Sequence, residues 1–405
     1  MTDASARALG RKIAFYRGQR GLSQRDFSAM IERSETWVSQ VERGVRRVDR
    51  MTVLRRVADA LAVPLSELAA ETPVIAAVNE RPEHAVALRM LLSSSLALAL
   101  AAEHGSVPFD EAAEIDVEHA WVLTHAGAYD ELLPLLMRLL PTLEARVRRA
   151  RGAARRRAYG ELARTYHSCA AALSKLRETD AAWVAADRAI AAAEASGDPL
   201  LMAEGAFRLT LVFQADRRHE QAAATARTAV EALQPLVDGD ELPAIAIQGA
   251  LRLQLAIVAA RQNDVDRAYE EMRLARQAGE RLGDGRNDYH TEFGPTNVSL
   301  HEISVAVELG DAGTALGVAS RMDASALSPE RQARLLIDVA RAHMQRRQFD
   351  AVIRALCQAE ELTPEQVRRH RAVRALIHDL GRARLGGDTK LRDLADRCGI
   401  RLPSN

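Results

Sequence analysis

Short polar segments recur along most of the chain, at spacings of about 37 to 50 residues. Most are followed by segments rich in small residues, such as Ala181-Ala-Trp-Val-Ala-Ala186. Small residues three or four positions apart allow two antiparallel helices to approach closely. This repetition of helical hairpins predicts an α-solenoid, in which each hairpin packs against its neighbours. The polar turns are Gly127–Asp130, Glu178–Asp180, Arg217–His219, Asn263–Asp264, Gly310–Asp311 and Arg347–Gln348.

The composition agrees with an all-α fold. Hydrophobic residues make up 48% of the 405 residues and aromatic residues only 4%, which favours close-packed helices over sheets. The net charge is zero but uneven, because residues 1–72 hold 13 Lys or Arg against 9 Asp or Glu. A basic N-terminal region followed by an acidic remainder is expected where only that region meets phosphate.

The first 72 residues predict a separate bundle of five short helices. We expect helices at about 4–19, after Ser23, after Ser34, at about 50–61 and from Pro64. Ser23 is followed three residues later by Asp26, which is a capping arrangement at a helix N-terminus. Gly21 is placed to end the first helix and Gly44 the third.

This N-terminal segment resembles the Cro/repressor-type helix-turn-helix family, often called XRE-like. The matching residues are Arg17-x-x-x-Gly-Leu-Ser-Gln24, Val38-Ser-Gln-Val-Glu-Arg-Gly44 and Leu54…Ala58-x-x-Leu61-x-Val63…Leu68. The resemblance implies a DNA-binding domain whose third helix enters the major groove. It also implies that Arg17 and Glu42 form an ion pair that locks the first helix to the third.

The resemblance assigns residues to the expected DNA interface. Gln24 would anchor a phosphate, and Glu35, Thr36, Ser39 and Gln40 would face base edges. Two positions depart from the family pattern: Glu32 stands where the turn usually has Gly, and Ser28 where the second helix usually has Ala. A Glu at positive φ would cost about 1 kcal/mol. The predicted interface comprises Gln24, Ser34, Glu35, Thr36, Trp37, Ser39, Gln40, Arg43, Arg46 and Arg47.

Several of these residues have a second interpretation. Glu35 either complements the helix dipole or accepts a hydrogen bond from a cytosine amino group. Trp37 either contacts a thymine methyl or sugar, or packs on the second helix. Gln40 can bind adenine in bidentate fashion. The basic loop of Arg43, Arg46, Arg47 and Arg50 either contacts phosphates or is a solvated surface.

The remainder of the chain resembles the tetratricopeptide-repeat class, with longer and more variable periods. The best single match is Leu335…Ala340…Phe349…Ala351…Leu356…Ala359…Pro364. We expect the helix-turn-helix domain at 1–72, a linker at 73–82, a tetratricopeptide-like sensor and dimerisation domain at 83–385, and a C-terminal tail at 386–405. The whole chain resembles bacterial regulators of actinobacterial type that join these two domains.

One long connection, Gly283 to Asn297, interrupts the repeats. Long non-repetitive connections in compact proteins are often functional, and the alternative is an irregular loop. In the functional interpretation, Asn297 and His301 face the concave side together with Arg252 and Arg208. Their amide and guanidinium groups could then hold a peptide backbone or an acidic small molecule.

Features of catalysis, metal binding and membrane insertion are absent from the sequence. There is no GxxxxGK[ST], HExxH or G-x-S-x-G motif, so we expect no enzyme, no cofactor and no metal. The cysteines Cys169, Cys357 and Cys398 form no CxxC pair, which favours a reducing cytoplasm. The apolar run Leu96–Ala102 is shorter than the roughly 20 residues that a membrane span needs.

The sequence therefore predicts a cytoplasmic transcription regulator that binds a double-stranded DNA operator as a homodimer. Its repeat domain would sense a peptide, a small molecule or a protein partner. The alternative is a protein-interaction scaffold, or an antitoxin-like partner binder, with little reading of DNA sequence. Glu32 and Trp37 are the residues that favour this alternative.

Overall fold

The computed structural model describes residues 3–46, 48, 51–61, 63, 68, 83–92, 113–381, 388–400 and 402. Every regular element in these residues is a helix, which confirms the expected fold class. The chain divides into two compact units, residues 1–80 with 377–405, and residues 81–376. The expected linker at 73–82, the apolar run Leu96–Ala102 and most of the fifth N-terminal helix lie outside the described residues.

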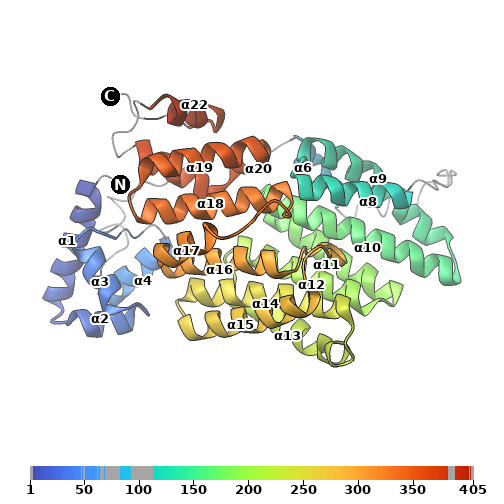
Figure 1. Cartoon of the computed structure of the whole chain (residues 1–405), viewed down its shortest axis with the longest axis horizontal. Coiled ribbons are helices and arrows are strands. Elements are labelled where there is room, and N and C mark those ends of the chain that lie inside the picture. The colour runs from blue at the N-terminus through green and yellow to red at the C-terminus, as the bar shows by residue number, and fades with distance from the viewer. Residues whose placement is uncertain are drawn as a thin grey trace. The chain divides into compact units, whose positions relative to one another are not determined.

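Four of the five expected N-terminal helices lie within the described residues, and they pack as a bundle (Figure 1). They are α1 (Asp3–Gln19), α2 (Gln24–Met30), α3 (Glu35–Glu42) and α4 (Met51–Leu61). Ser23 forms the predicted capping box with Asp26, and the Ser34 side chain accepts a hydrogen bond from the Trp37 amide at the start of α3. The core contains Leu9, Ile13, Phe27, Ile31, Trp37, Val38, Val41, Leu54 and Val57.

Gly10 sets the distance between α1 and α3. A Cβ atom at Gly10 would lie 2.3 Å from the carbonyl oxygen of Val41 and 2.6 Å from that of Glu42. Both atoms belong to the backbone of α3 and its end, so they cannot rotate away as a side chain could. The two helices therefore pack this closely only because position 10 has no side chain.

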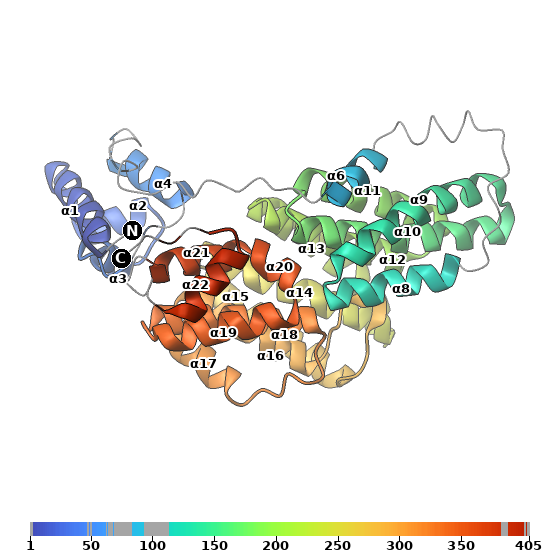
Figure 2. The ribbon, with the colours of Figure 1, turned by 90° about the horizontal axis from the view of Figure 1, so that it is seen from above.

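The described part of the body contains six helical hairpins, and every predicted polar turn joins the two helices of one hairpin (Figures 1 and 2). The hairpins are α8 (Ala113–Ala126) with α9 (Tyr129–Arg149), α10 (Gly152–Lys175) with α11 (Thr179–Ser196), α12 (Pro199–Ala215) with α13 (His219–Asp238), α14 (Leu242–Gln262) with α15 (Val265–Leu282), α16 (Pro295–Leu309) with α17 (Ala312–Ala319), and α18 (Pro329–Gln345) with α19 (Phe349–Leu362). The remaining described helices are α6 (Glu83–Leu91), η1 (Asp288–His290), α20 (Pro364–Arg369), α21 (Arg371–Leu380) and α22 (Thr389–Arg397).

Small residues pack the helices of each hairpin together, as the sequence predicted. In α11, residues Ala182, Ala185, Ala186 and Ala189 are fully buried. The first helices of successive hairpins also contact one another, from α10 through α12, α14 and α16 to α18. Helix α14 has the length and apolar composition of a membrane span, yet 83% of its most apolar window is buried inside the fold. That burial is typical of a core helix.

The solenoid curls until its first hairpins meet its last ones. The ammonium group of Lys175, at the end of α10, pairs with the carboxylate of Glu330 at the start of α18. The Asp130 amide donates to the Glu365 carboxylate at 3.1 Å, which joins α9 to α20. The inner surface of the superhelix is therefore lined by side chains from both of its ends.

Candidate functional site

Helix α3 presents the short polar side chains that the sequence placed on a DNA interface. Ser34, Glu35 and Thr36 are exposed, and Ser39 and Gln40 are partly exposed. The buried residues Val38 and Val41 hold the opposite face of α3 in the core. The exposed residues Ser34, Glu35 and Thr36 lie at the N-terminal end of α3, which is the part that contacts base edges in helix-turn-helix proteins.

The ion pair implied by the family resemblance is present. The Arg17 Nε atom lies 2.6 Å from Glu42 Oε1, and Arg17 NH2 donates to Glu42 Oε2 at 3.1 Å. Glu42 also accepts a hydrogen bond from the side-chain amide of Gln24 at 2.6 Å. One carboxylate at the end of α3 therefore fixes α1 and the start of α2, so the exposed face of α3 is rigidly oriented.

The turn before α3 keeps its geometry despite the departure from the family pattern. Glu32 adopts φ 51°, the left-handed conformation that Gly usually supplies. Its carboxylate lies 2.6 Å from the Arg56 guanidinium of α4. Both side chains are exposed, and an exposed ion pair contributes little by itself, typically about 0–1 kcal/mol. This turn therefore adopts the left-handed conformation with Glu in place of the usual Gly.

Trp37 belongs to the core and is only 8% exposed. Its packing interpretation therefore fits the structure, and its inclusion in the DNA interface does not. Arg43 and Arg46 are exposed after α3, whereas Arg47 and Arg50 lie outside the described residues. The described part of the predicted basic surface is thus Arg43 and Arg46 beside the exposed face of α3.

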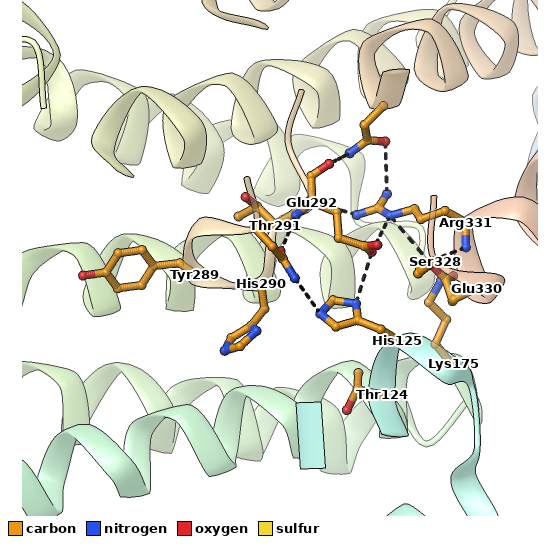
Figure 3. Close-up of polar contacts among 12 residues, drawn as sticks. Thr124, His125, Lys175, Tyr289, His290, Thr291, Glu292, Ser328, Glu330 and Arg331 are labelled. Atoms are coloured by element: carbon orange, nitrogen blue, oxygen red, sulfur yellow. Dashed lines mark hydrogen bonds and ion pairs between the residues drawn. The ribbon is translucent and has the colours of Figure 1, made fainter. Parts of the chain in front are cut away.

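A second polar cluster surrounds the connection between α15 and α16 (Figure 3). Residues Tyr289, His290 and Glu292 all have positive φ, at 49°, 54° and 49°. For residues other than Gly, this conformation costs roughly 1–2 kcal/mol each. Strained backbone of this kind persists only where the surrounding structure holds it, and it clusters at functional sites.

Side chains from α12, α16 and α18 bind the main-chain carbonyls of this connection. Arg208 of α12 donates to the carbonyl of His290 at 2.9 Å and to that of Tyr289 at 3.4 Å. Arg331 of α18 donates to the carbonyl of Thr291 at 3.1 Å. The Asn297 amide of α16 donates to the carbonyl of Glu292 at 2.9 Å. Four consecutive carbonyls are therefore recognised by side chains. We call residues 289–292 the inserted segment.

The side chains of the inserted segment are held as well. The His290 ring stacks on Trp121 of α8, with ring centroids 4.0 Å apart and planes 7° from parallel. The Glu292 carboxylate lies 3.1 Å from both His125 Nδ1 and Arg331 Nε (Figure 3). These contacts join the connection to both ends of the superhelix.

Phe293 anchors the residue that follows the inserted segment. It is 1% exposed, and its ring lies directly over Gly249 of α14. A Cβ atom at Gly249 would lie 2.1 Å from the ring. The missing side chain at position 249 therefore makes the pocket for this ring.

Burial and opposite charges determine the protonation of these groups. Burial raises the pKa of Glu292, but His125 and Arg331 outweigh it and lower that pKa to about 2. Burial also raises the pKa of Glu204, but His167 and Arg208 outweigh this effect and lower that pKa to about 2. Burial lowers the pKa of His290 to about 3. Near neutral pH both carboxylates are ionised and the stacked imidazole is neutral.

The four predicted ligand residues have different surroundings. Arg208 and Asn297 do hold a peptide backbone, but it is the chain's own. His301 lies beside them in the core, where its Nδ1 atom donates to the Asn297 carbonyl at 2.9 Å. Arg252 pairs instead with Glu271 of α15 at 3.2 Å, so it does not join the others. The expected set of four residues on one concave surface is therefore incomplete.

Sequence reasoning missed Trp121, His125, Gly249 and Arg331. Trp121 and His125 lie four residues apart on α8, a spacing that places two side chains on one helix face. Arg331 gave no signal, because an arginine in the first turn of an amphipathic helix is usually solvated. The closure of the superhelix brings these distant residues to the inserted segment.

Residues 8–70 match a family model described as a helix-turn-helix domain. No curated protein matches the chain. Among solved structures, PlcR of Bacillus thuringiensis, in complex with the peptide PapR7 and DNA, is 16% identical, with a TM-score of 0.33 over 68% of this chain and 95% of that one. Aspartyl phosphate phosphatase F from Bacillus subtilis is 14% identical, with a TM-score of 0.47 over 90% of this chain and 95% of that one. The N-terminal region is thus a helix-turn-helix domain.

Proposed function

We propose that this chain is a sequence-specific DNA-binding transcription regulator of the XRE-like type, whose helical-repeat domain senses a peptide. The observation that carries the proposal is the exposed polar face of α3, held rigidly by the pairing of Arg17 with Glu42. A rigid helix with Glu35, Ser39 and Gln40 on its accessible face suits direct readout in the major groove. We further propose that the protein acts in the cytoplasm, as a homodimer and without catalytic activity.

The scaffold alternative loses the two residues that favoured it. Trp37 lies in the core, so a bulky side chain does not obstruct the face of α3. Glu32 adopts the positive φ that the turn between α2 and α3 requires. Neither Trp37 nor Glu32 is therefore an argument against sequence-specific DNA binding.

Selection of bound sequences from random duplexes, using the full chain, tests the proposal. We expect enrichment of a motif with two-fold symmetry. Gln40→Ala should relax the preference at one base pair by about 1–3 kcal/mol of discrimination while the other positions stay unchanged. Absence of any enriched motif would support the scaffold alternative, and an unchanged motif with Gln40→Ala would refute the reader role of Gln40.

A further inference from the structure

We propose that Arg208, Asn297 and Arg331 form the main-chain-binding site for the effector peptide, and that the inserted segment occupies this site in the free protein. The inference rests on the proposed peptide-sensing function and names the site and the ligand chemistry. An effector peptide would bind by displacing residues 289–292 together with Phe293, whose ring fills the pocket over Gly249. The protein would then carry its own competitor for the ligand.

The first argument is the type of contact. Main-chain carbonyls of four consecutive residues accept hydrogen bonds from side chains of α12, α16 and α18. Loops are usually held by their own backbone and by local side chains, whereas here Arg208 lies 82 residues from His290 in sequence. Recognition through carbonyls is independent of side-chain identity, so the same groups can hold another peptide.

The second argument is the strain in the inserted segment. Tyr289, His290 and Glu292 occupy the left-handed region, in which their side chains are unfavourable. The segment is therefore held in place by the contacts of the site against its own backbone preference. A peptide without this constraint can make the same hydrogen bonds in a relaxed backbone, and displacement would also release the strain.

The third argument is that the site also holds side chains, at positions next to the main-chain contacts. The site offers an aromatic surface at Trp121 for a planar ring and an apolar pocket over Gly249 for a second ring. Between them, His125 and Arg331 hold a carboxylate. We infer that the effector is a short peptide with an acidic side chain or terminal carboxylate flanked by aromatic residues.

A complementation experiment tests the inference. Phe293→Ala in the full chain removes the anchor of the inserted segment and leaves the pocket over Gly249 empty. The probe is a fluorescent peptide with the sequence of residues 287–294, Asn-Asp-Tyr-His-Thr-Glu-Phe-Gly, with both ends blocked. Its binding is measured by fluorescence anisotropy in the absence of DNA.

We expect the Phe293→Ala protein to bind the peptide and the wild-type protein to bind it far more weakly. A short tether gives the internal segment an effective concentration on the order of 1 mM, so a site with a Kd of about 10–100 μM would bind the probe roughly 10- to 100-fold more weakly in the wild type. Adding Gly249→Ala should fill the pocket and abolish binding. Adding Arg331→Gln should weaken it at least about tenfold, since a charge-assisted hydrogen bond and an ion pair are lost.

Gly160→Ala is the matched control, because its Cβ atom would make only an ordinary contact, 3.7 Å from Leu201 Cδ1. It should leave probe binding as weak as in the wild type. If Phe293→Ala does not fold, as judged by circular dichroism, His290→Ala is tested with the same probe. It removes only the stacking of the inserted segment on Trp121. Equal binding by the opened and wild-type proteins, or equal binding of a scrambled probe, would overturn the inference.

The assay also separates this inference from the proposed function. It contains no DNA, so its outcome does not depend on whether α3 reads a sequence. If the wild-type protein selects a DNA motif but the Phe293→Ala protein does not bind the probe, the proposed DNA binding stands and the proposed peptide site is refuted.

Discussion

At the residue scale, two glycines of α1 have opposite roles. Gly10 contacts the α3 backbone so closely that an added methyl group forces the helices apart. At Gly18, no side chain and no other helix lies within 4 Å of where a Cβ atom would be. We expect Gly10→Ala to destabilise the helix-turn-helix domain by about 1–3 kcal/mol through overpacking. Gly18→Ala should be neutral or stabilise it by up to about 1 kcal/mol, because Ala favours the helix.

Urea unfolding followed by circular dichroism measures both substitutions, and DNA binding gives a second readout. Because α3 would be displaced, Gly10→Ala should also weaken binding to the selected motif. Equal stability of the two variants would show that α1 and α3 can separate without cost, in contradiction to the close packing described above.

Also at the residue scale, His290 makes stability depend on pH. Burial lowers its folded-state pKa to about 3, while Glu204 nearby opposes this shift and Arg208, Arg164 and His125 add to it. The unfolded state takes up a proton near pH 6.5, so stability falls as the pH drops from about 6.5 towards 3, by at most about 1.4 kcal/mol per pH unit. Glu292, with its pKa of about 2, adds a loss only below about pH 4.3.

His290→Phe keeps a ring for stacking on Trp121 and removes the titrating group. Between pH 7 and pH 5 the wild type should lose about 2 kcal/mol more stability than this variant. Burial lowers the pKa values of His301 and His370 as well, and both residues are present in the two proteins, so the difference isolates His290. Parallel pH profiles in urea unfolding would contradict the expectation.

At the element scale, much of the fold followed from local sequence signals. Ser23 and Ser34 predicted the starts of α2 and α3, and the six polar turns predicted the hairpins of the body. These signals depend on a few neighbouring residues, so they can be recognised without the tertiary structure. The role of Gly10 could not be predicted, because its contacts lie about 31 residues away in sequence on another helix.

The inserted segment shows why the body site was only partly predicted. Its unusual composition identified residues 283–297 as a candidate, and the pattern at Arg208 and Asn297 suggested backbone binding. Tyr and Glu give no local sign of a left-handed backbone, which is uncommon for residues other than Gly. The arrangement depends on the closure of the superhelix, which brings α8 and α18 to one segment.

The exposed arginines after α3 lead to another prediction at the element scale. Arg43 and Arg46 follow the polar face of α3 and are exposed. If both contact phosphates, Arg43→Ala with Arg46→Ala should weaken binding to all duplexes and flatten the slope of log K against log salt by about 2. Arg273→Ala, at an exposed arginine of α15 that pairs with Glu270, is the control and should leave the slope unchanged. Weakened binding to the selected motif alone would assign these arginines to base reading instead.

At the scale of the whole molecule, the proposed regulation requires that the body and the N-terminal domain share one conformational equilibrium. A peptide can regulate DNA binding only if it binds more tightly to one of two conformations of the protein. Displacement of the inserted segment supplies such a difference, because it would break contacts that join α8, α12, α16 and α18. The coupling is reciprocal, so operator DNA should shift the affinity for the peptide by the same factor.

The proposed homodimer makes a geometric prediction at the same scale. Two α3 helices in successive major grooves on one side of the duplex would read half-sites about 10–10.5 base pairs apart, or a multiple of that distance. Inserting five base pairs between the selected half-sites turns one of them to the opposite side of the duplex, and binding in a gel-shift assay should fall to that of a single half-site. A two-fold symmetric dimer also requires inverted half-sites, so reversing one of them at constant spacing should have the same effect. Tolerance of both changes would mean that each chain binds independently, and the dimer would have to be abandoned.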